Sequence, residues 1–195
     1  MEVKIHHCVA TIPAGEYVRK YRDIPKFLGC CQQCPGFGKT WSCPPFDFDI
    51  SGMFDGFSQA MVFGTQIFFD EDTRAECKTQ NQSRLAAGKA IKQAWTSLLP
   101  FLYDLESRFA GSRIFVGRCR LCPNQECTRI SGLPCRHPAD MRHSLESVGF
   151  DLNRTAKDLL GIELLWSTDG TLPEYLTLVT ALFTRETVAP VLPPE

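Results

Sequence analysis

The sequence predicts an α+β protein, in which a mostly antiparallel sheet is covered by one long helix and several short ones. Two observations support this: β-prone segments are spread along the whole chain, and one long central stretch has apolar residues at helical spacing. A third observation is that two cysteine-rich segments separate these elements, which predicts two metal-binding loops at one end of the sheet. The length of 195 residues fits one core, so we expect a single metal-binding domain over residues 1–195.

The first half of the chain is predicted to hold two strands, a loop and the long helix. Residues 3–12 are β-prone, and residues 59–69 are rich in Val, Ile and Phe. Residues 30–58 between them are rich in Cys, Pro, Gly and Phe, so we expect an irregular loop that needs metal to become ordered. Residues 74–109 have the helical apolar pattern, and Pro100 is expected to kink or split that helix.

The middle of the second half is predicted to contain the second cysteine loop. Residues 114–117 form a short apolar run that is typical of a buried strand, and it leads directly into the cysteine loop of residues 119–138. Two short helices are expected after this loop, over residues 140–147 and 153–160.

The C-terminal part is predicted to be a hairpin followed by a tail. Residues 162–166 and 175–183 are β-prone and flank the turn-like sequence Thr168-Asp169-Gly170-Thr171. The last six residues, 190–195, include three prolines and are expected to be loose.

Composition and charge exclude several classes of function. The net charge is -1, which gives no reason to expect binding to nucleic acid or to a membrane surface. No apolar run approaches the roughly 18 residues that span a bilayer, and residues 1–10 lack the apolar stretch of a signal peptide. We therefore expect a cytoplasmic protein, in which ten cysteines bind metal or serve redox chemistry rather than form disulfides. Disulfides remain the alternative for an exported chain.

The stronger cysteine pattern lies in the second loop. It reads Cys119-x2-Cys122-x4-Cys127-x7-Cys135, so four thiolates occur within 17 residues. Four thiolates are the ligand set of a [4Fe–4S] cluster or of a tetrahedral zinc site. The gaps differ from those of bacterial ferredoxins, so an ordinary ferredoxin motif is excluded.

The first loop also offers four sulfurs, in the pattern Cys30-Cys31-x2-Cys34-x8-Cys43. Adjacent cysteines seldom bind one metal together, so we expect Cys34, Cys43 and either Cys30 or Cys31 to be ligands. The fourth ligand is then the other cysteine of that pair, Cys8 or a group from outside the protein. Three protein thiolates would leave one coordination position open, as in catalytic metal sites. A structural zinc site is the alternative.

Arginines surround the second pattern. Between residues 113 and 142 the chain has six arginines and no lysine. We expect Arg118, Arg120 and Arg136 to lie around the bound cofactor, because guanidinium groups stabilise the negative charge of a thiolate-bound cluster. The helix expected after Pro138 would direct its positive N-terminus towards Cys135. The alternative is that these arginines are ordinary solvated surface charges.

The remaining cysteines and histidines are weaker candidates. Cys8 and Cys77 are expected to be buried small apolar residues in a strand and a helix. His6 and His7 are expected to occupy strand positions. His137 is a minor alternative ligand and is expected mainly to serve a turn or a cap.

These motifs resemble a prokaryotic family of predicted metal-binding proteins of unknown function, domain of unknown function 2284. One signature is CPGFGKTWSCPP, from Cys34 to Pro45; the other is PCRHP at residues 134–138 with SLESVG at 144–149. Phe37 stands where a tyrosine is common in such sequences. The resemblance covers roughly residues 25–165, implies a bacterial or archaeal source, and leaves the choice between Cys30 and Cys31 open. It implies metal ligation by Cys34, Cys43, Cys119, Cys122, Cys127 and Cys135.

The leading functional hypothesis is an iron–sulfur protein with one or two [4Fe–4S]-type clusters, acting in electron transfer or as an accessory to a redox partner protein. A second hypothesis is an enzyme whose first site has an open metal position that binds a small substrate. A third is a zinc-stabilised binding module without redox function. The sequence does not decide whether the protein is an enzyme.

Overall fold

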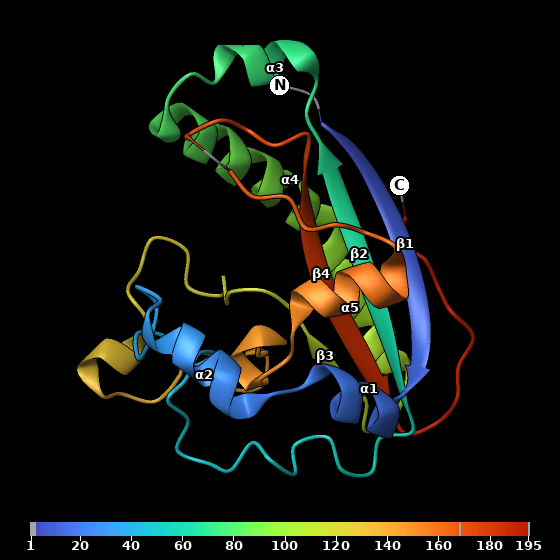
Figure 1. The fold of residues 1–195 in the computed structure, drawn as a ribbon. Coiled ribbons are helices and arrows are strands. Elements are labelled where there is room, and N and C mark those ends of the chain that lie inside the picture. Colours follow the sequence, from blue (N-terminus) through green and yellow to red (C-terminus); the bar gives the residue numbers. More distant parts are fainter. Residues whose placement is uncertain (1–2, 168, 195) are drawn as a thin grey trace.

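The structure is a computed structural model that describes residues 3–167 and 169–194. Its centre is one antiparallel sheet with the strand order β1-β2-β4-β3 (Figure 1). The strands are β1 (Lys4–Pro13), β2 (Gln59–Phe68), β3 (Arg113–Phe115) and β4 (Tyr175–Thr184). The predicted strands at residues 3–12, 59–69, 114–117 and 175–183 correspond to these four, and the α+β class is confirmed.

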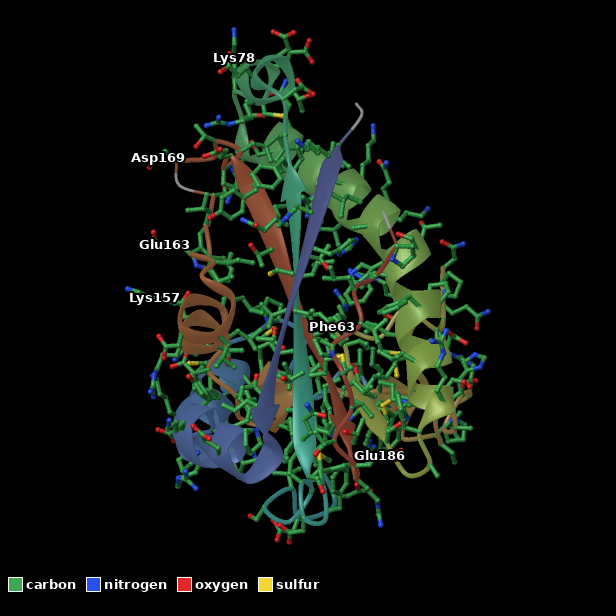
Figure 2. All side chains as sticks on the ribbon, turned by 90° about the vertical axis from the view of Figure 1, so that its right-hand side faces the viewer. Phe63, Lys78, Lys157, Glu163, Asp169 and Glu186 are labelled. Atoms are coloured by element: carbon green, nitrogen blue, oxygen red, sulfur yellow. The ribbon has the colours of Figure 1, made fainter. Side chains whose placement is uncertain are left out.

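Helices cover both faces of this sheet. They are α1 (Ala14–Tyr21), α2 (Ile24–Gln32), α3 (Glu71–Glu76), α4 (Gln80–Arg108) and α5 (Leu152–Leu160), with 3-10 helices η1 (Thr128–Ser131) and η2 (Glu146–Val148). The long helix α4 lies on one face, and α1 and α5 lie on the other (Figures 1 and 2). No described helix is both long and apolar enough to cross a membrane.

Alternation along β2 explains why both faces can be covered. Successive side chains of a strand point to opposite faces, so Ala60 and Val62 join one core while Met61 and Phe63 join the other. The second core receives the apolar side of α4, including Leu98, which is fully buried. The strand β2, whose residues are almost all buried, therefore contributes side chains to both cores.

An aromatic cluster connects the sheet to the C-terminal sides of the two cysteine loops. Phe54, near the end of the first loop, lies 4.6 Å from Phe183 of β4 and 5.1 Å from Phe150, measured between ring centroids. Phe150 follows the second loop and stacks on Tyr17 of α1 at 4.6 Å. These contacts fix the far ends of both loops to the same buried surface, which holds the loops near each other.

Two of the predicted helices differ from the structure. The helix expected over residues 74–109 is divided into α3 and α4, because Thr79 caps a new helix by accepting a hydrogen bond from Gln82 N. Pro100 does not split it, since α4 continues through that residue. The helix expected over 140–147 is wrong; only η2 forms there. His143 O accepts a hydrogen bond from Val116 N, so this segment runs beside the end of β3 instead.

The predicted hairpin is also wrong. Residues 162–166 form no strand, because both edges of β4 are already paired, one with β2 and the other with β3. Ile162 instead packs on the face of the sheet at Gly64, where a Cβ atom would come within 2.7 Å of its side chain. Thr168 of the expected turn lies outside the described residues. The expected helix over 153–160 is confirmed as α5.

Candidate metal centre

The first cysteine loop begins inside a helix, which corrects the prediction of an irregular segment from residue 30 onward. Asp23 caps α2 by accepting a hydrogen bond from Lys26 N at 3.1 Å, and the helix extends to Gln32. Cys30 and Cys31 therefore occupy neighbouring helical positions, about 100° apart around the axis. The two thiols point in different directions, and Cys30 is exposed whereas Cys31 is half-buried.

Cys31 is the less exposed member of the pair and lies near the other thiols of the loop. Burial raises the pKa of the Cys31 thiol, and the neighbouring Cys43, Glu146 and Cys34 raise it further, in that order. Cys30 makes a smaller contribution than any of them. The structure thus brings Cys31, Cys34 and Cys43 towards one another, with a carboxylate nearby.

The loop from residue 34 to residue 45 is held by its own turns. Cys34 N donates to Cys31 O at 3.0 Å, and Gly38 N donates to Pro44 O at 2.9 Å. The sulfur of Cys34 accepts a hydrogen bond from Gly36 N at 3.4 Å. Backbone N–H groups directed at sulfur stabilise the thiolate form that binds metal.

The second cysteine loop surrounds a cavity. Cys119, Cys122, Cys127 and Cys135 all line one hollow of about 510 Å³. Burial raises the pKa of the Cys119 thiol, a backbone hydrogen bond at Leu121 lowers it, and the three other thiols raise it. Four sulfurs thus converge on one space without any of them being fully buried.

Positive and N–H groups also face this cavity. Arg136 Nη1 lies 3.8 Å from the sulfur of Cys122 and donates to Glu126 O at 2.9 Å. His137 N donates to the sulfur of Cys135 at 3.4 Å, while the His137 side chain lines the cavity. Arg118 lines it as well. These groups lower the energy of negative charge on the sulfurs.

Not every predicted arginine lies in the cavity. Arg120 stacks over Trp95 of α4, 5.4 Å from the ring centroid, and lines a small neighbouring cavity of about 50 Å³, which Cys119 and Arg118 also line. Arg142 forms an ion pair with Glu106 at 2.6 Å. The arginines around the second loop therefore have different contacts. Of these described arginines, Arg118 and Arg136 line the cysteine cavity.

The two cysteine loops are bound directly to each other, which the sequence patterns did not indicate. Arg129 of the second loop donates to Thr40 O at 2.8 Å and also to Cys43 O and Pro45 O. Trp41 of the first loop donates from Nε1 to Leu133 O at 3.2 Å. Figure 1 shows the segment after α2 beside the yellow segment that contains η1.

The thiols are spread around each site rather than gathered at a single point. Within residues 3–167 and 169–194, no three Cys, His, Asp or Glu side chains are close enough to hold one metal ion. All ten cysteines are free thiols. The chemistry of the donor sets, four sulfurs at the second site and three at the first, still fits a thiolate-bound metal or cluster.

The minor candidates lie elsewhere. Cys8 lies in the middle of β1 with its sulfur 3.7 Å from Gly64 O, and Cys77 is buried in the core beside α4. His7 contacts Thr65 Oγ1 at 2.9 Å across β1 and β2. Cys77 is thus a core residue as expected, and Cys8 lies in the sheet, partly buried.

The fold and the site define a class: a cysteine-rich α+β protein in which two cysteine loops contact each other and the four cysteines of the second loop line one cavity. The chain belongs to the family described as predicted metal-binding protein (DUF2284), whose model matches residues 19–183. This match confirms the resemblance found from the cysteine motifs. No curated protein and no solved structure matches the chain.

Proposed function

We propose that this protein is an iron–sulfur protein that serves electron transfer or acts as a redox accessory to a partner protein. Its second loop binds a [4Fe–4S]-type cluster through Cys119, Cys122, Cys127 and Cys135. The observation that supports this most is the cavity of about 510 Å³ that all four cysteines line. Such a cluster supplies one-electron chemistry when it is bound.

The size of the cavity that the four cysteines line favours a cluster over zinc. Zinc needs all four sulfurs about 2.3 Å from one point. In a four-iron cluster each sulfur binds a different iron atom, so the sulfurs stand farther apart. The four described cysteines line a cavity of about 510 Å³, which has room for the four iron and four sulfide atoms of the second arrangement.

The charge around the cavity also suits a cluster. A four-thiolate cluster is an anion, and Arg118 and Arg136 face the cavity, with Lys39 from the first loop on its wall. Hydrogen bonds to the sulfurs of Cys122 and Cys135 would raise the reduction potential. The protein's own residues thereby hold the cofactor and set how readily it accepts an electron.

The first loop would hold a second cluster with Cys31, Cys34 and Cys43 as its protein ligands. Because the loops contact each other through Arg129 and Trp41, two clusters would be close enough for electron exchange. Three thiolates leave one iron without a cysteine, and this favours the second candidate function, an enzyme that binds a small substrate at that iron.

Spectroscopy on protein purified without oxygen tests the proposal. An iron–sulfur protein is expected to be brown, to bleach with dithionite, and to give an electron paramagnetic resonance signal in the reduced state. Adding a small ligand such as cyanide should leave this signal unchanged in a simple carrier and alter it in an open-site enzyme. A colourless protein that contains zinc would contradict the proposal.

A further inference from the structure

A second cavity lies beside the cysteine cavity and contains no cysteine. It has a volume of about 380 Å³, within the usual range of small-molecule sites. Trp41, Phe46 and Phe48 provide its aromatic walls, and Arg129 and His143 also line it. Trp41 and Met141 line the cysteine cavity as well, so these two side chains lie between the two spaces.

The aromatic walls form one connected group. The rings of Phe46 and Phe48 lie 5.2 Å apart, and Phe46 meets the imidazole of His143 edge to face at 4.9 Å. Phe48 is 45% exposed, which is unusual for a phenylalanine in contact with other rings. An aromatic side chain held open at a cavity mouth offers a stacking surface for a flat molecule.

His143 is the buried polar group of this cavity. It is only 2% exposed, and its Nδ1 lies 3.2 Å from Ser42 O. A carbonyl oxygen only accepts, so Nδ1 carries the proton, and in the neutral ring Nε2 has a free lone pair. Burial lowers the pKa of His143 despite the Ser42 hydrogen bond, and the charges of Arg113 and Arg142 lower it further, so the ring is neutral near pH 7.

The other polar groups of the cavity restrict what it can accept. The guanidinium of Arg129 is already engaged by the carbonyl oxygens of Thr40, Cys43 and Pro45. It therefore has little capacity left for an acidic ligand. Asp47 lines the rim and adds a negative charge. The cavity thus presents hydrogen-bond acceptors and ring faces, and it disfavours a carboxylate.

We propose that this cavity binds a flat aromatic or heteroaromatic molecule that donates one N–H or O–H hydrogen bond to Nε2 of His143. The rings of Trp41, Phe46 and Phe48 supply the stacking surface. The bound molecule would lie next to the cysteine cavity, separated from it by Trp41 and Met141. This site goes beyond the proposed electron-transfer function and does not depend on which metal the thiols hold.

Two probes that differ in one atom group test this proposal. Indole is flat and donates an N–H hydrogen bond, whereas 1-methylindole has nearly the same shape and no donor. The full chain, purified without oxygen and with its metal content measured, is titrated with each probe by calorimetry. We expect indole to bind about tenfold more tightly, the effect of one buried hydrogen bond of about 1.4 kcal/mol.

Variants locate the binding. His143→Phe should abolish the preference for indole. Phe48→Ala should weaken both probes about fivefold, and because Phe48 is exposed this variant is expected to fold even where His143→Phe does not. Leu85→Ala, at another exposed apolar residue, is the control and should change nothing. Absence of indole binding, equal affinity for both probes, or binding unaffected by Phe48→Ala would overturn the proposal.

Discussion

The guanidinium of Arg129, in the second cysteine loop, lies 5.2 Å from the ring centroid of Trp41, in the first. The same guanidinium donates hydrogen bonds to three carbonyl oxygens of the first loop. Two segments about ninety residues apart in sequence thus share one partly buried contact at the candidate metal centre. Folding of one loop therefore supports the other.

Arg129→Lys tests this coupling. A lysine ammonium is a single point donor and cannot bridge three carbonyl oxygens as a planar guanidinium does. We expect residues 34–45 to exchange amide hydrogens about tenfold faster or more, since hydrogen bonds to a charged group contribute about 1.5–3 kcal/mol each. Metal content should fall as well. Hydrogen exchange followed by mass spectrometry measures the first effect.

Arg108→Lys is the matched control for that variant. Arg108 pairs with Asp104 on the surface of α4, where both side chains are more than half exposed. Exposed pairs contribute little, so exchange in residues 34–45 should stay as in the parent protein. Equal exchange in the two variants would show that Arg129 does not hold the first loop.

The adjacent cysteines give a paired prediction. Because Cys31 lies near Cys34 and Cys43 while Cys30 is exposed, Cys31→Ser should lower the metal content of the chain and Cys30→Ser should not. Inductively coupled plasma mass spectrometry on protein purified without oxygen measures this. The reverse pattern would assign the ligand to Cys30.

The second loop gives a similar pair. Cys127→Ser removes one of the four sulfurs around the large cavity, so about four iron atoms should be lost if a cubane is held there. Cys77→Ser replaces a buried core residue away from both loops, and metal content should not change. Normal metal content in Cys127→Ser would contradict the assignment of this cavity.

Gly149 controls how closely α2 approaches η2. Its φ is 101°, and an added Cβ would lie 3.0 Å from the Cα atom of Ile24. Gly149→Ala should therefore lower the unfolding midpoint in urea, at a cost of about 1–3 kcal/mol. Gly29→Ala is the control, because position 29 lies inside α2 with open space around it, and alanine there should stabilise by up to about 1 kcal/mol. A neutral Gly149→Ala would mean that α2 is free to move.

His143 gives a prediction for pH. Its pKa is lowered in the folded state by burial, so below about pH 6.5 the unfolded chain binds a proton that the folded chain does not. Stability should therefore fall as the pH drops from about 6.5, by at most about 1.4 kcal/mol per pH unit for this one group. Urea unfolding at several pH values should show this loss in the parent protein.

His143→Gln is the comparison for the pH series. Its amide keeps a donor for Ser42 O but does not titrate, so the variant should lose less stability on acidification than the parent protein. Subtracting the pH dependence of stability of the variant from that of the parent protein removes the contributions of the thiols and of the other histidines. Parallel pH curves would show that His143 is not held neutral.

The strands and the helices α4 and α5 could be predicted from apolar periodicity, because β2 and α4 are long. Helices α1 and α2 were not predicted. The prediction of a strand over residues 162–166 was wrong because both edges of β4 are already paired with other strands. A local sequence pattern does not show which edges of a strand are free. The helix over 140–147 failed because His143 O bonds to Val116 N, a tertiary contact. The loose tail expected over residues 190–195 stays a prediction, although Val191 packs against the core.

Cysteine spacing was sufficient to divide the thiols into two groups, one in each loop. It did not show how the two loops contact each other. Spacing alone left Cys30 and Cys31 equivalent, and the phase of helix α2 distinguishes them. The roles of Arg129 and Trp41 depend on contacts between distant loops, so they appeared only with the three-dimensional structure. His143 was missed for the same reason, since its partner Ser42 is 101 positions away.

The most direct test of whether this protein holds an iron–sulfur cluster is the content of iron, zinc and acid-labile sulfide per chain, measured on protein purified without oxygen. We expect iron and sulfide in equal amounts, about four of each for one cluster or about eight for two. Stoichiometric zinc with no sulfide would contradict this expectation and would leave a zinc-stabilised binding module.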